Sequence, residues 1–362
     1  MNPASPPDPT SWLAFVPRDT VFVRDGRPFD AATDATAQTV RPSPTTIAGA
    51  IGYAFGIDPV KLRERPDGRE IRGPVLARRY LDQWEPYFPV PADLVVTTDR
   101  RRVFRLRPEP ADGKTDLQGG PRCWLQPPED AGPVEPLRGW IPGEVLAEYL
   151  TGNLPAPDGT DLADLRHIAD PLVPEPRVGL AREDRRARTG YLYQATHLRP
   201  DGDWGFLAEY ATPGQAPPEP RRRHVPFGGK GRLADLEPAA MSWPVMGAPD
   251  GRVLVYLATP AVWPGGWELP VPHGASLIAA ATSEPEPAVT VTPGAGWQAS
   301  RALRWAVPAG SVYLLEFTVA AVGARWARDW HGVALDRGVS GDRRNDLVRT
   351  AGFGVALTGA WT

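Results

Sequence analysis

Cysteine is nearly absent from this chain of 362 residues, and histidine is sparse. The single cysteine, Cys123, excludes an intrachain disulfide and a metal cluster held by thiolates, which fits a reducing compartment. The histidines show no His-x-x-x-His spacing that would hold zinc. They are His167, His197, His224, His273 and His331. We therefore expect no metal site and no cofactor.

Long apolar runs are also missing. No stretch approaches the roughly 20 residues needed to span a bilayer. Residues Met1–Pro9 are rich in proline and lack the charged and then apolar pattern of a secretion signal. These absences predict a soluble, cytoplasmic protein. A triphosphate-binding loop of the Gly-x-x-x-x-Gly-Lys-Ser/Thr type is absent as well.

Lysine is scarce: Lys61, Lys114 and Lys230 are the only lysines among 40 basic residues, and the net charge is −3. This balance argues against a protein that binds polyanions over its whole surface. The charges are nevertheless unevenly distributed, because the segment from Arg177 to Arg232 carries eleven basic residues and six acidic ones. A basic middle in an acidic remainder predicts a defined RNA groove, with other surfaces left for protein partners.

Two local patterns favour phosphate binding. In the first, Arg24 and Arg27 flank an Asp-Gly turn directly after an apolar strand, so that two forked donors lie on one edge. In the second, Ser43 is the expected N-cap and Pro44 the first residue of a helix that includes Thr45. The N-terminus of such a helix attracts an anion. Each pattern alone also fits an ordinary turn or helix start.

The chain is long enough for two domains. Apolar alternation predicts strands at 12–16 and 20–23, a hairpin from 94–98 and 102–106, and later strands at 191–197, 205–210, 253–258, 277–281 and 312–322. Apolar residues at helical spacing predict helices at 45–55 and 142–150. The interval 155–176 is expected to be an extended connection, and 325–330 either a helix or a loop bearing tryptophans. This is an α+β pattern in a ferredoxin-like order.

Further motifs recur in a fixed order along the chain. They are Phe22–Phe29, Pro42–Ile51, Gly190–Tyr193 with His197–Arg199, Phe227–Arg232, Val307–Phe317, and Gly352–Gly354 with Gly359 and Trp361. In this order and spacing, the set resembles the family of subunit three of the type III-B CRISPR (Cmr) effector complex, within the repeat-associated (RAMP) proteins. The resemblance spans nearly the whole chain, from Trp12 to Trp361.

The resemblance implies two ferredoxin-like (RRM-type) domains with long inserted loops and hairpins. We expect a disordered tail at 1–10, an N-terminal domain at 11–175, a basic connecting hairpin region at 176–240, and a C-terminal domain with a glycine-rich loop at 241–362. It also implies a non-catalytic subunit in antiviral defence. Such a subunit binds the 5′ tag of the guide crRNA and bridges the large polymerase-like subunit to a backbone RAMP subunit of the filament.

The expected RNA contacts combine the basic and glycine-rich motifs. Glycine turns bring backbone N–H groups close to phosphate, and aromatic side chains such as Trp326, Trp330 and Trp361 are candidates for base stacking. The RNA-binding residues we expect are Arg24, Arg27, Ser43, Thr45, Arg185, Arg186, Arg188, Gly228, Gly229, Lys230, Arg232, Gly352 and Gly354. We further expect the arginine-bearing turns to converge on one trough.

Two other functions remain open from the residues alone. One is a metal-independent endoribonuclease that processes CRISPR repeat RNA, in which His197 near the arginines 185, 186 and 188 serves as the base for a 2′-hydroxyl. In the other, the chain is a scaffold whose aromatic patches bind only proteins. A hydrogen-bonded structural histidine is the competing interpretation of His197.

Overall fold

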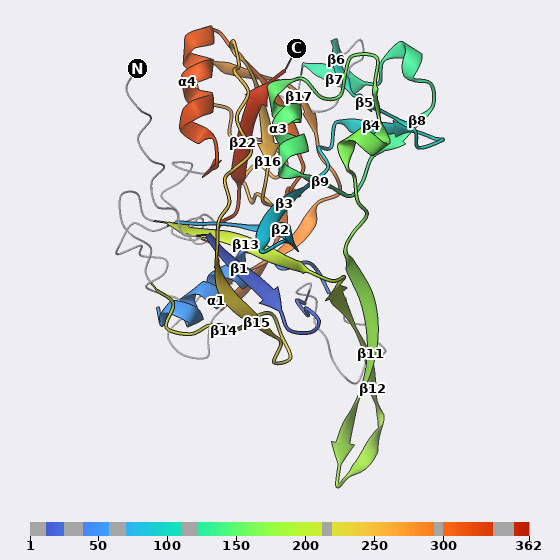
Figure 1. Ribbon diagram of the computed structural model, residues 1–362, viewed down its shortest axis with the longest axis vertical. Coiled ribbons are helices and arrows are strands. Elements are labelled where there is room, and N and C mark those ends of the chain that lie inside the picture. The colour runs from blue at the N-terminus through green and yellow to red at the C-terminus, as the bar shows by residue number, and fades with distance from the viewer. Residues whose placement is uncertain are drawn as a thin grey trace.

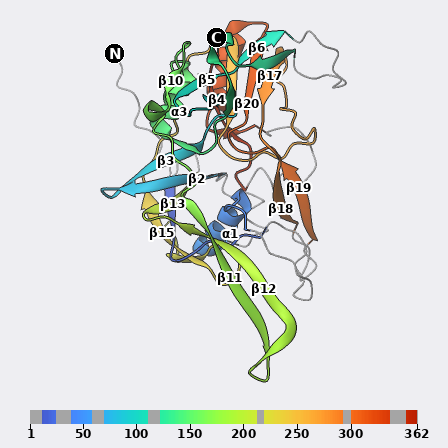
Figure 2. The ribbon, with the colours of Figure 1, turned by 90° about the vertical axis from the view of Figure 1, so that its right-hand side faces the viewer.

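The computed structural model describes residues 12–24, 39–57, 70–110, 122–211, 219–292, 300–335 and 351–361. The two largest antiparallel sheets lie next to each other, with few helices, and one long two-stranded hairpin extends away from them (Figures 1 and 2). Arg27 and the expected N-terminal tail at 1–10 lie outside the described residues.

The first sheet has seven strands in the order β14-β15-β1-β13-β2-β3-β9. Their bounds are β1 (Trp12–Pro17), β2 (Glu70–Tyr80), β3 (Gln83–Pro89), β9 (Trp140–Pro142), β13 (Trp204–Ala211), β14 (His224–Pro226) and β15 (Leu233–Ala239). Helix α1 (Pro44–Phe55) follows β1 and precedes β2. Because β1 and β2 each pair antiparallel with β13 between them, this is a split β-α-β unit.

Helix α1 begins and ends as its sequence predicts. Ser43 occupies the N-cap position with extended backbone, and Pro44 opens the helix, where its missing N–H costs nothing. The helix ends at Gly56, which adopts the left-handed conformation common after a last turn. Ile47, Ile51 and other apolar residues are buried against the first sheet, which confirms the predicted apolar stripe.

The second sheet has five strands in the order β17-β20-β16-β22-β21. Their bounds are β16 (Arg252–Leu257), β17 (Ala275–Ala281), β20 (Val312–Phe317), β21 (Val333–Ala334) and β22 (Val355–Ala360). Helix α4 (Ala320–Trp330) follows β20, and β20 and β22 pair antiparallel with β16 between them. The predicted strand at 312–322 is therefore wrong beyond Phe317.

The expected α+β class is confirmed, since the described chain is mostly antiparallel sheet with few helices. A pair of complete ferredoxin-like domains is not confirmed. In the first sheet, α1 lies between β1 and β2 and a second helix, Gly143–Thr151, follows β9; in the second sheet, α4 follows β20. The described residues between β13 and β15 and between β16 and β17 contain no helix. The range 176–240, expected to connect the domains, supplies β13, β14 and β15 of the first sheet.

Smaller elements accompany the two halves of the molecule, one built on the first sheet and the other on the second. A four-stranded sheet has the order β10 (Thr160–Asp161), β5 (Arg102–Arg105), β4 (Leu94–Thr97), β8 (Val134–Pro136), which confirms the predicted β4–β5 hairpin. Two further pairs are β6 (Arg107–Pro110) with β7 (Cys123–Gln126), and β18 (Glu286–Thr292) with β19 (Ser300–Ala306). Helix α3 (Gly143–Thr151) matches the predicted one; the short 3-10 helices are η1 (Glu129–Ala131) and η2 (Leu162–Leu165).

One continuous core joins the two sheets. It contains Trp12 and Leu207 of the first sheet together with Leu254 and Leu357 of the second, and α3 contributes further apolar side chains. The contact between α3 and β22 requires Gly359, because a Cβ there would lie 2.3 Å from the carbonyl oxygen of Leu150. The two halves are thus held by shared apolar packing, the largest favourable contribution to folding.

The tryptophans expected to stack on bases are part of this packing. Trp326 of α4 packs against Phe317 and Trp330 with ring centroids 5.7 and 6.2 Å apart. Trp361 is buried, and its indole N–H donates to the carbonyl of Leu315 at 2.9 Å. Trp361 is thus occupied within the protein, whereas base stacking by the partly exposed Trp326 and Trp330 stays a prediction.

The protruding hairpin consists of β11 (Leu172–Glu183) and β12 (Arg186–Pro200). At about 3.4 Å per residue, its twelve-residue first strand reaches about 40 Å. Asp184 and Arg185 form the turn, both with positive φ. Figures 1 and 2 show that only the base of this hairpin lies against the sheets.

Candidate nucleic-acid interface

The segment 20–24, which precedes the Asp-Gly motif, lies between the hairpin base and a glycine turn. Val21 exchanges two backbone hydrogen bonds with Leu198 of β12, at 2.7 and 2.9 Å. On its other side, Phe22 forms a bridge with Gly228, and the N–H of Gly229 donates to the carbonyl of Phe22 at 2.6 Å. Three predicted motifs therefore meet here: the Arg24 segment, the turn from Phe227 to Arg232, and the end of β12.

The Gly-Gly-Lys turn needs its glycines for close packing. Gly228 has a φ of +91°, and a Cβ there would lie 2.4 Å from the carbonyl oxygen of Phe22. Lys230 follows in the left-handed region, with its ammonium 5.2 Å from the centre of the Phe22 ring. The glycines act through the protein backbone, and their effect is to hold Lys230 over Phe22.

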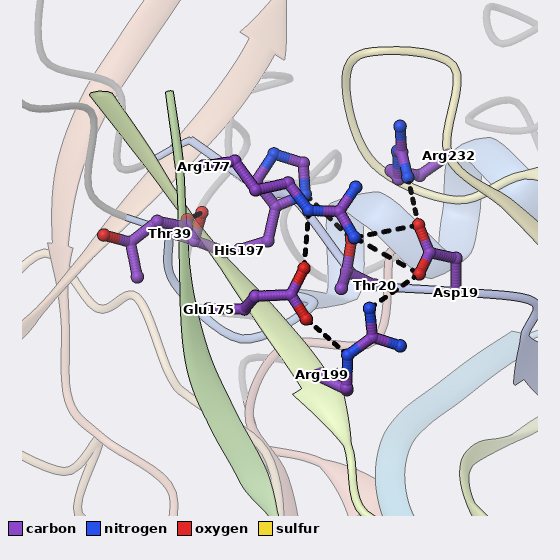
Figure 3. A network of polar contacts seen from close by, with 9 residues as sticks. Asp19, Thr20, Thr39, Glu175, Arg177, His197, Arg199 and Arg232 are labelled. Atoms are coloured by element: carbon purple, nitrogen blue, oxygen red, sulfur yellow. Dashed lines mark hydrogen bonds and ion pairs between the residues drawn. The ribbon is translucent and has the colours of Figure 1, made fainter. Parts of the chain in front are cut away.

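Five charged side chains at the hairpin base form what we call the arginine clasp: Asp19, Glu175, Arg177, Arg199 and Arg232. Asp19 accepts from Arg177 at 3.1 Å, from Arg199 at 3.0 Å and from Arg232 at 2.5 Å. Glu175 accepts from Nε of Arg177 at 2.6 Å and also from Nε of Arg199. Figure 3 shows the two carboxylates alternating with the guanidinium groups.

The clasp keeps its carboxylates ionised. Hydrogen bonds from Arg199 and Arg177 lower the pKa of Glu175 below its ordinary value. Burial alone raises the pKa of Asp19, but its hydrogen bonds and charge attraction to Arg177 outweigh burial and lower it. Three arginines against two carboxylates leave a positive charge, to which Lys230 adds, since its charge acts on His197 together with those of Arg177 and Arg232. All members of the clasp are partly exposed, so this positive charge attracts an anionic ligand that approaches the surface.

His197 lies behind the clasp and is only 3% exposed. Its Nδ1 is 2.8 Å from the hydroxyl of Thr20, and its ring packs on Phe22 with a centroid distance of 4.7 Å. Burial, together with the charges of Arg177 and Arg232, lowers the pKa of His197, so it is neutral at pH 7. These contacts are those of a structural histidine.

Ser43 and Thr45 start α1 a short distance along the chain from Arg24. Arg24 pairs with Thr39, and the N–H of Val40 donates to the carbonyl of Val23 at 2.9 Å. The hydroxyls of Ser43 and Thr45 are 2.8 Å apart, and the Ser43 side chain forms no capping bond to the helix backbone. The predicted N-cap is thus correct in position, while its hydroxyl is paired with a neighbouring side chain.

The hairpin arginines do not join this site. Arg185 and Arg186 are exposed at the hairpin tip, and Arg188 lies two residues further along β12. Eleven residues of strand separate Arg186 from His197, which is about 37 Å. The expectation that all the arginine turns converge on one trough is therefore wrong for the tip, because a continuous hairpin holds it away from the sheets.

Gly352 and Gly354 also lie elsewhere, in the interior between the sheets. A Cβ on Gly352 would lie 2.9 Å from the carbonyl oxygen of Gly73, and the Gly352 carbonyl accepts from the hydroxyl of Thr259 at 2.8 Å. Phe353 between them is 1% exposed. The expectation that this loop offers its backbone to RNA is wrong in this structure, because its glycines serve packing between the halves.

Sequence reasoning missed most of the clasp. Four of its five members were not among the expected RNA contacts: Asp19, Glu175, Arg177 and Arg199. Of these, only Arg199 belongs to a motif noted in the sequence, His197–Arg199. The signal that would have found them is the i, i+2 pattern of Glu175 with Arg177 on one strand and of His197 with Arg199 on the other. Register pairs Glu175 with His197, so these side chains share one end of the hairpin.

The described residues contain no group of three or more side chains suited to a metal ion. None of the helices in the described ranges has the length and apolar character to cross a membrane.

Comparison with known proteins places the chain in a family. Residues 13–361 match the model described as CRISPR-associated protein (Cas_Cmr3). The chain belongs to this family. The match confirms the resemblance seen in the sequence, and it covers both sheets and the hairpin. No curated protein matches the chain.

Solved structures share the fold at low identity. A chain from the "Cryo-EM structure of the Type III-B Cmr-beta bound to cognate target RNA and AMPPnP, state 1" is 13% identical, with a TM-score of 0.51 over 94% of each chain. A second, from the "Cryo-EM structure of the Type III-B Cmr-beta bound to cognate target RNA", is 14% identical, with a TM-score of 0.48 over 84% of this chain and 86% of that one.

Proposed function

We propose that this chain is a non-catalytic, RNA-binding subunit of a type III-B CRISPR effector ribonucleoprotein in the cytoplasm. In this proposal it holds the 5′ tag of the guide crRNA and bridges the large polymerase-like subunit to a backbone RAMP subunit. Its two sheets are proposed to derive from ferredoxin-like units. Family membership and the likeness to a chain of an RNA-bound Cmr complex support this assignment.

The observation that carries the proposal is the meeting of Lys230 and the arginine clasp at the hairpin base, next to the backbone segment that ends at Arg24. Backbone bonds fix these groups on rigid elements, so their positive charge is already in place when the RNA arrives. Phosphates bind such a surface with a strong dependence on salt. The hairpin arginines, about 37 Å away, reach a different part of the same assembly.

Bridging needs apolar contact surfaces besides the basic one. The turn between β2 and β3 exposes Tyr80 and Leu81, which are 69% and 81% exposed. Exposed tyrosine side chains are typical anchors of protein interfaces, and the neighbouring leucine extends the apolar surface. We assign this turn to a protein partner within the complex.

The endoribonuclease alternative finds no support at His197. A general base must lie within hydrogen-bond reach of the hydroxyl it deprotonates, whereas His197 is buried and bonded to Thr20. In our proposal, therefore, the RNA leaves the protein uncut.

The test is a double charge reversal, Arg24→Glu with Lys230→Glu, measured by anisotropy with labelled repeat-derived RNA over a range of salt. The expected result is weaker binding and a salt slope smaller by about 0.7 for each phosphate that the protein no longer neutralises. The matched control is Arg325→Glu with Arg328→Glu on the exposed face of α4, which makes the same change in net charge. If the two double variants bind RNA equally, the proposed site is wrong.

A further inference from the structure

A cavity lies between the two halves of the molecule, away from the clasp. Its volume is about 170 Å³. Its walls come from β2 and β3 of the first sheet, from the residues following β16, from the β18–β19 pair, and from the segment that leads into α1. Small-molecule sites occur preferentially at such junctions between domains. The clasp, Lys230 and Arg24 are not among the residues that line it.

The walls of the cavity are aromatic and small. Tyr87 and Trp140 contribute rings from the first sheet, and Phe353 contributes a ring from the second half. Ala288 and Ala306 of the β18–β19 pair also line the cavity, where larger side chains would take up its space. A cavity of about 150 Å³ admits one six-membered ring, so this one has room for a single flat ring system.

Three polar side chains line the same cavity: Arg41, Ser43 and Glu286. Glu286 makes no hydrogen bond to any of the described residues, and burial raises the pKa of its carboxyl, against the attraction of Arg41. Glu286 shares a strand face with Ala288 and pairs in register with Ala306, both lining residues. The Glu286 carboxyl can therefore accept hydrogen bonds from a ring bound in the cavity.

The cavity also has a place for an anion. The guanidinium carbon of Arg41 lies 4.9 Å from the centre of the Trp140 ring, and the Arg41 side chain is half exposed and paired with Asp170. Ser43 stands at the N-terminus of the twelve-residue helix α1, which carries partial positive charge. An apolar protein side chain would pack on the aromatic walls but would make no favourable contact with this positive edge. A nucleotide can do both, because its base stacks on the rings and its phosphate pairs with the positive charge.

We propose that this cavity receives one nucleobase with an exocyclic amino group, which stacks on the aromatic wall and donates to Glu286 while its phosphate lies at Arg41. Adenine, cytosine and guanine carry such a group, and uracil does not, so uracil is rejected. If the base belongs to the bound RNA strand, this inference rests on the proposed function. A free nucleotide has the same chemistry and is the other source to be distinguished.

The experiment plugs the cavity. Ala309→Trp places a large ring at the edge of the cavity, and Ala321→Trp on the exposed face of α4 is the matched control. Binding to the full chain is measured with short oligouridine RNAs that contain one adenosine, cytidine or guanosine, with oligouridine itself, and with the four free nucleoside monophosphates. Thermal unfolding of each variant establishes that it is folded. Glu286→Gln, which keeps the side-chain volume, gives a second test if the plugged variant is unstable.

For a strand-borne base, we expect one of the mixed RNAs to bind wild type about tenfold more tightly than oligouridine, the effect of a single stacked and hydrogen-bonded base. Ala309→Trp removes this preference, Ala321→Trp keeps it, and Glu286→Gln reduces it. If the free monophosphates bind wild type and not the plugged variant, while RNA binding is the same in both, the source is a free nucleotide. The cavity proposal is overturned if neither RNA nor monophosphate distinguishes the plugged variant from its control. Failure of wild type to bind any of the RNAs overturns the proposed function instead.

Discussion

Asp19 and Arg232 lie 213 positions apart in the sequence, and Nη1 of Arg232 is 2.5 Å from Oδ2 of Asp19. The same carboxylate accepts from Arg177 of β11 and Arg199 of β12. One side chain therefore connects the end of β1, the glycine turn and both strands of the hairpin. We therefore expect this carboxylate to help fix the position of the hairpin relative to the basic surface.

Replacing Asp19 with asparagine is expected to loosen the hairpin base. The substitution leaves three arginines without their shared counter-charge. We expect a loss of about 1 kcal/mol in the free energy of unfolding, the upper end for exposed pairs, and faster amide exchange at Val21 and Leu198. Asp82→Asn, at a carboxylate that is 98% exposed in the β2–β3 turn, is the control. Equal exchange in the two variants would show that the clasp does not hold the hairpin.

The glycine turn gives a second expectation. Gly228→Ala places a Cβ 2.4 Å from the Phe22 carbonyl at a φ of +91°, so the turn must move. Gly231→Ala, at a φ of +67° in open space, has only the left-handed penalty of about 1 kcal/mol. We expect Gly228→Ala to cost at least about 2 kcal/mol in unfolding free energy, and to weaken RNA binding by displacing Lys230. Denaturant unfolding of both variants gives the comparison, and similar losses would contradict the close-packing role.

Much of the fold was predictable where local chemistry decides it. Ser43 and Pro44 mark the start of α1 because capping and the fixed φ of proline act within a few residues. The turn between β4 and β5 is equally local. Strand β2 was not predicted. Gly73 and Pro74 interrupt its pattern, and their place in the sheet depends on the close approach of Leu207 and Gly352, distant in sequence.

The end of β20 and the clasp show the same limit. The apolar residues from Val319 to Val322 read as a continued strand, whereas Gly323 and Ala327 pack α4 onto Phe317 of the sheet as a helix. Lys230 and its glycines could be predicted as one turn because they are adjacent in sequence. The carboxylate Asp19 was missed because its arginine partners lie 158 to 213 positions away and no local pattern records them.

His197 leads to a prediction of pH dependence. Its pKa is lowered in the folded state, so the unfolded chain binds more protons between that lowered pKa and about 6.5. Stability from the neutral ring is complete above about pH 6.5 and is lost as the pH falls through this window. His197→Gln is expected to flatten the dependence of the unfolding temperature on pH there. We also expect both wild type and the variant to leave repeat RNA uncut. Cleavage by wild type in chelator that disappears in the variant would instead establish the endoribonuclease.

The β2–β3 turn makes an assembly prediction. Leu81→Asp changes an exposed side chain that makes little contact within the chain, so the unfolding free energy is expected to change by less than about 0.5 kcal/mol. The contact with the partner subunit would lose the apolar side chain of Leu81, and we expect this chain to associate with that subunit at least tenfold more weakly. Co-expression with the other subunits and size-exclusion chromatography measures this, with Val245→Asp at another exposed position as control. Normal assembly of Leu81→Asp would remove the turn from the interface.

Glu286 gives the opposite pH dependence to that of His197. Its pKa is raised in the folded state, chiefly by burial, with Arg41 acting against the shift and Asp170 paired to Arg41 nearby. The folded chain therefore binds more protons than the unfolded chain between about pH 4.5 and the raised value, and stability falls as the pH rises through that window. Glu286→Gln cannot ionise, so we expect it to be more stable than wild type at pH 8 and to lose this advantage at about pH 4.5. Thermal unfolding of both proteins over that range makes the measurement. A difference that stays constant with pH would show that Glu286 titrates normally and is not held in the apolar cavity.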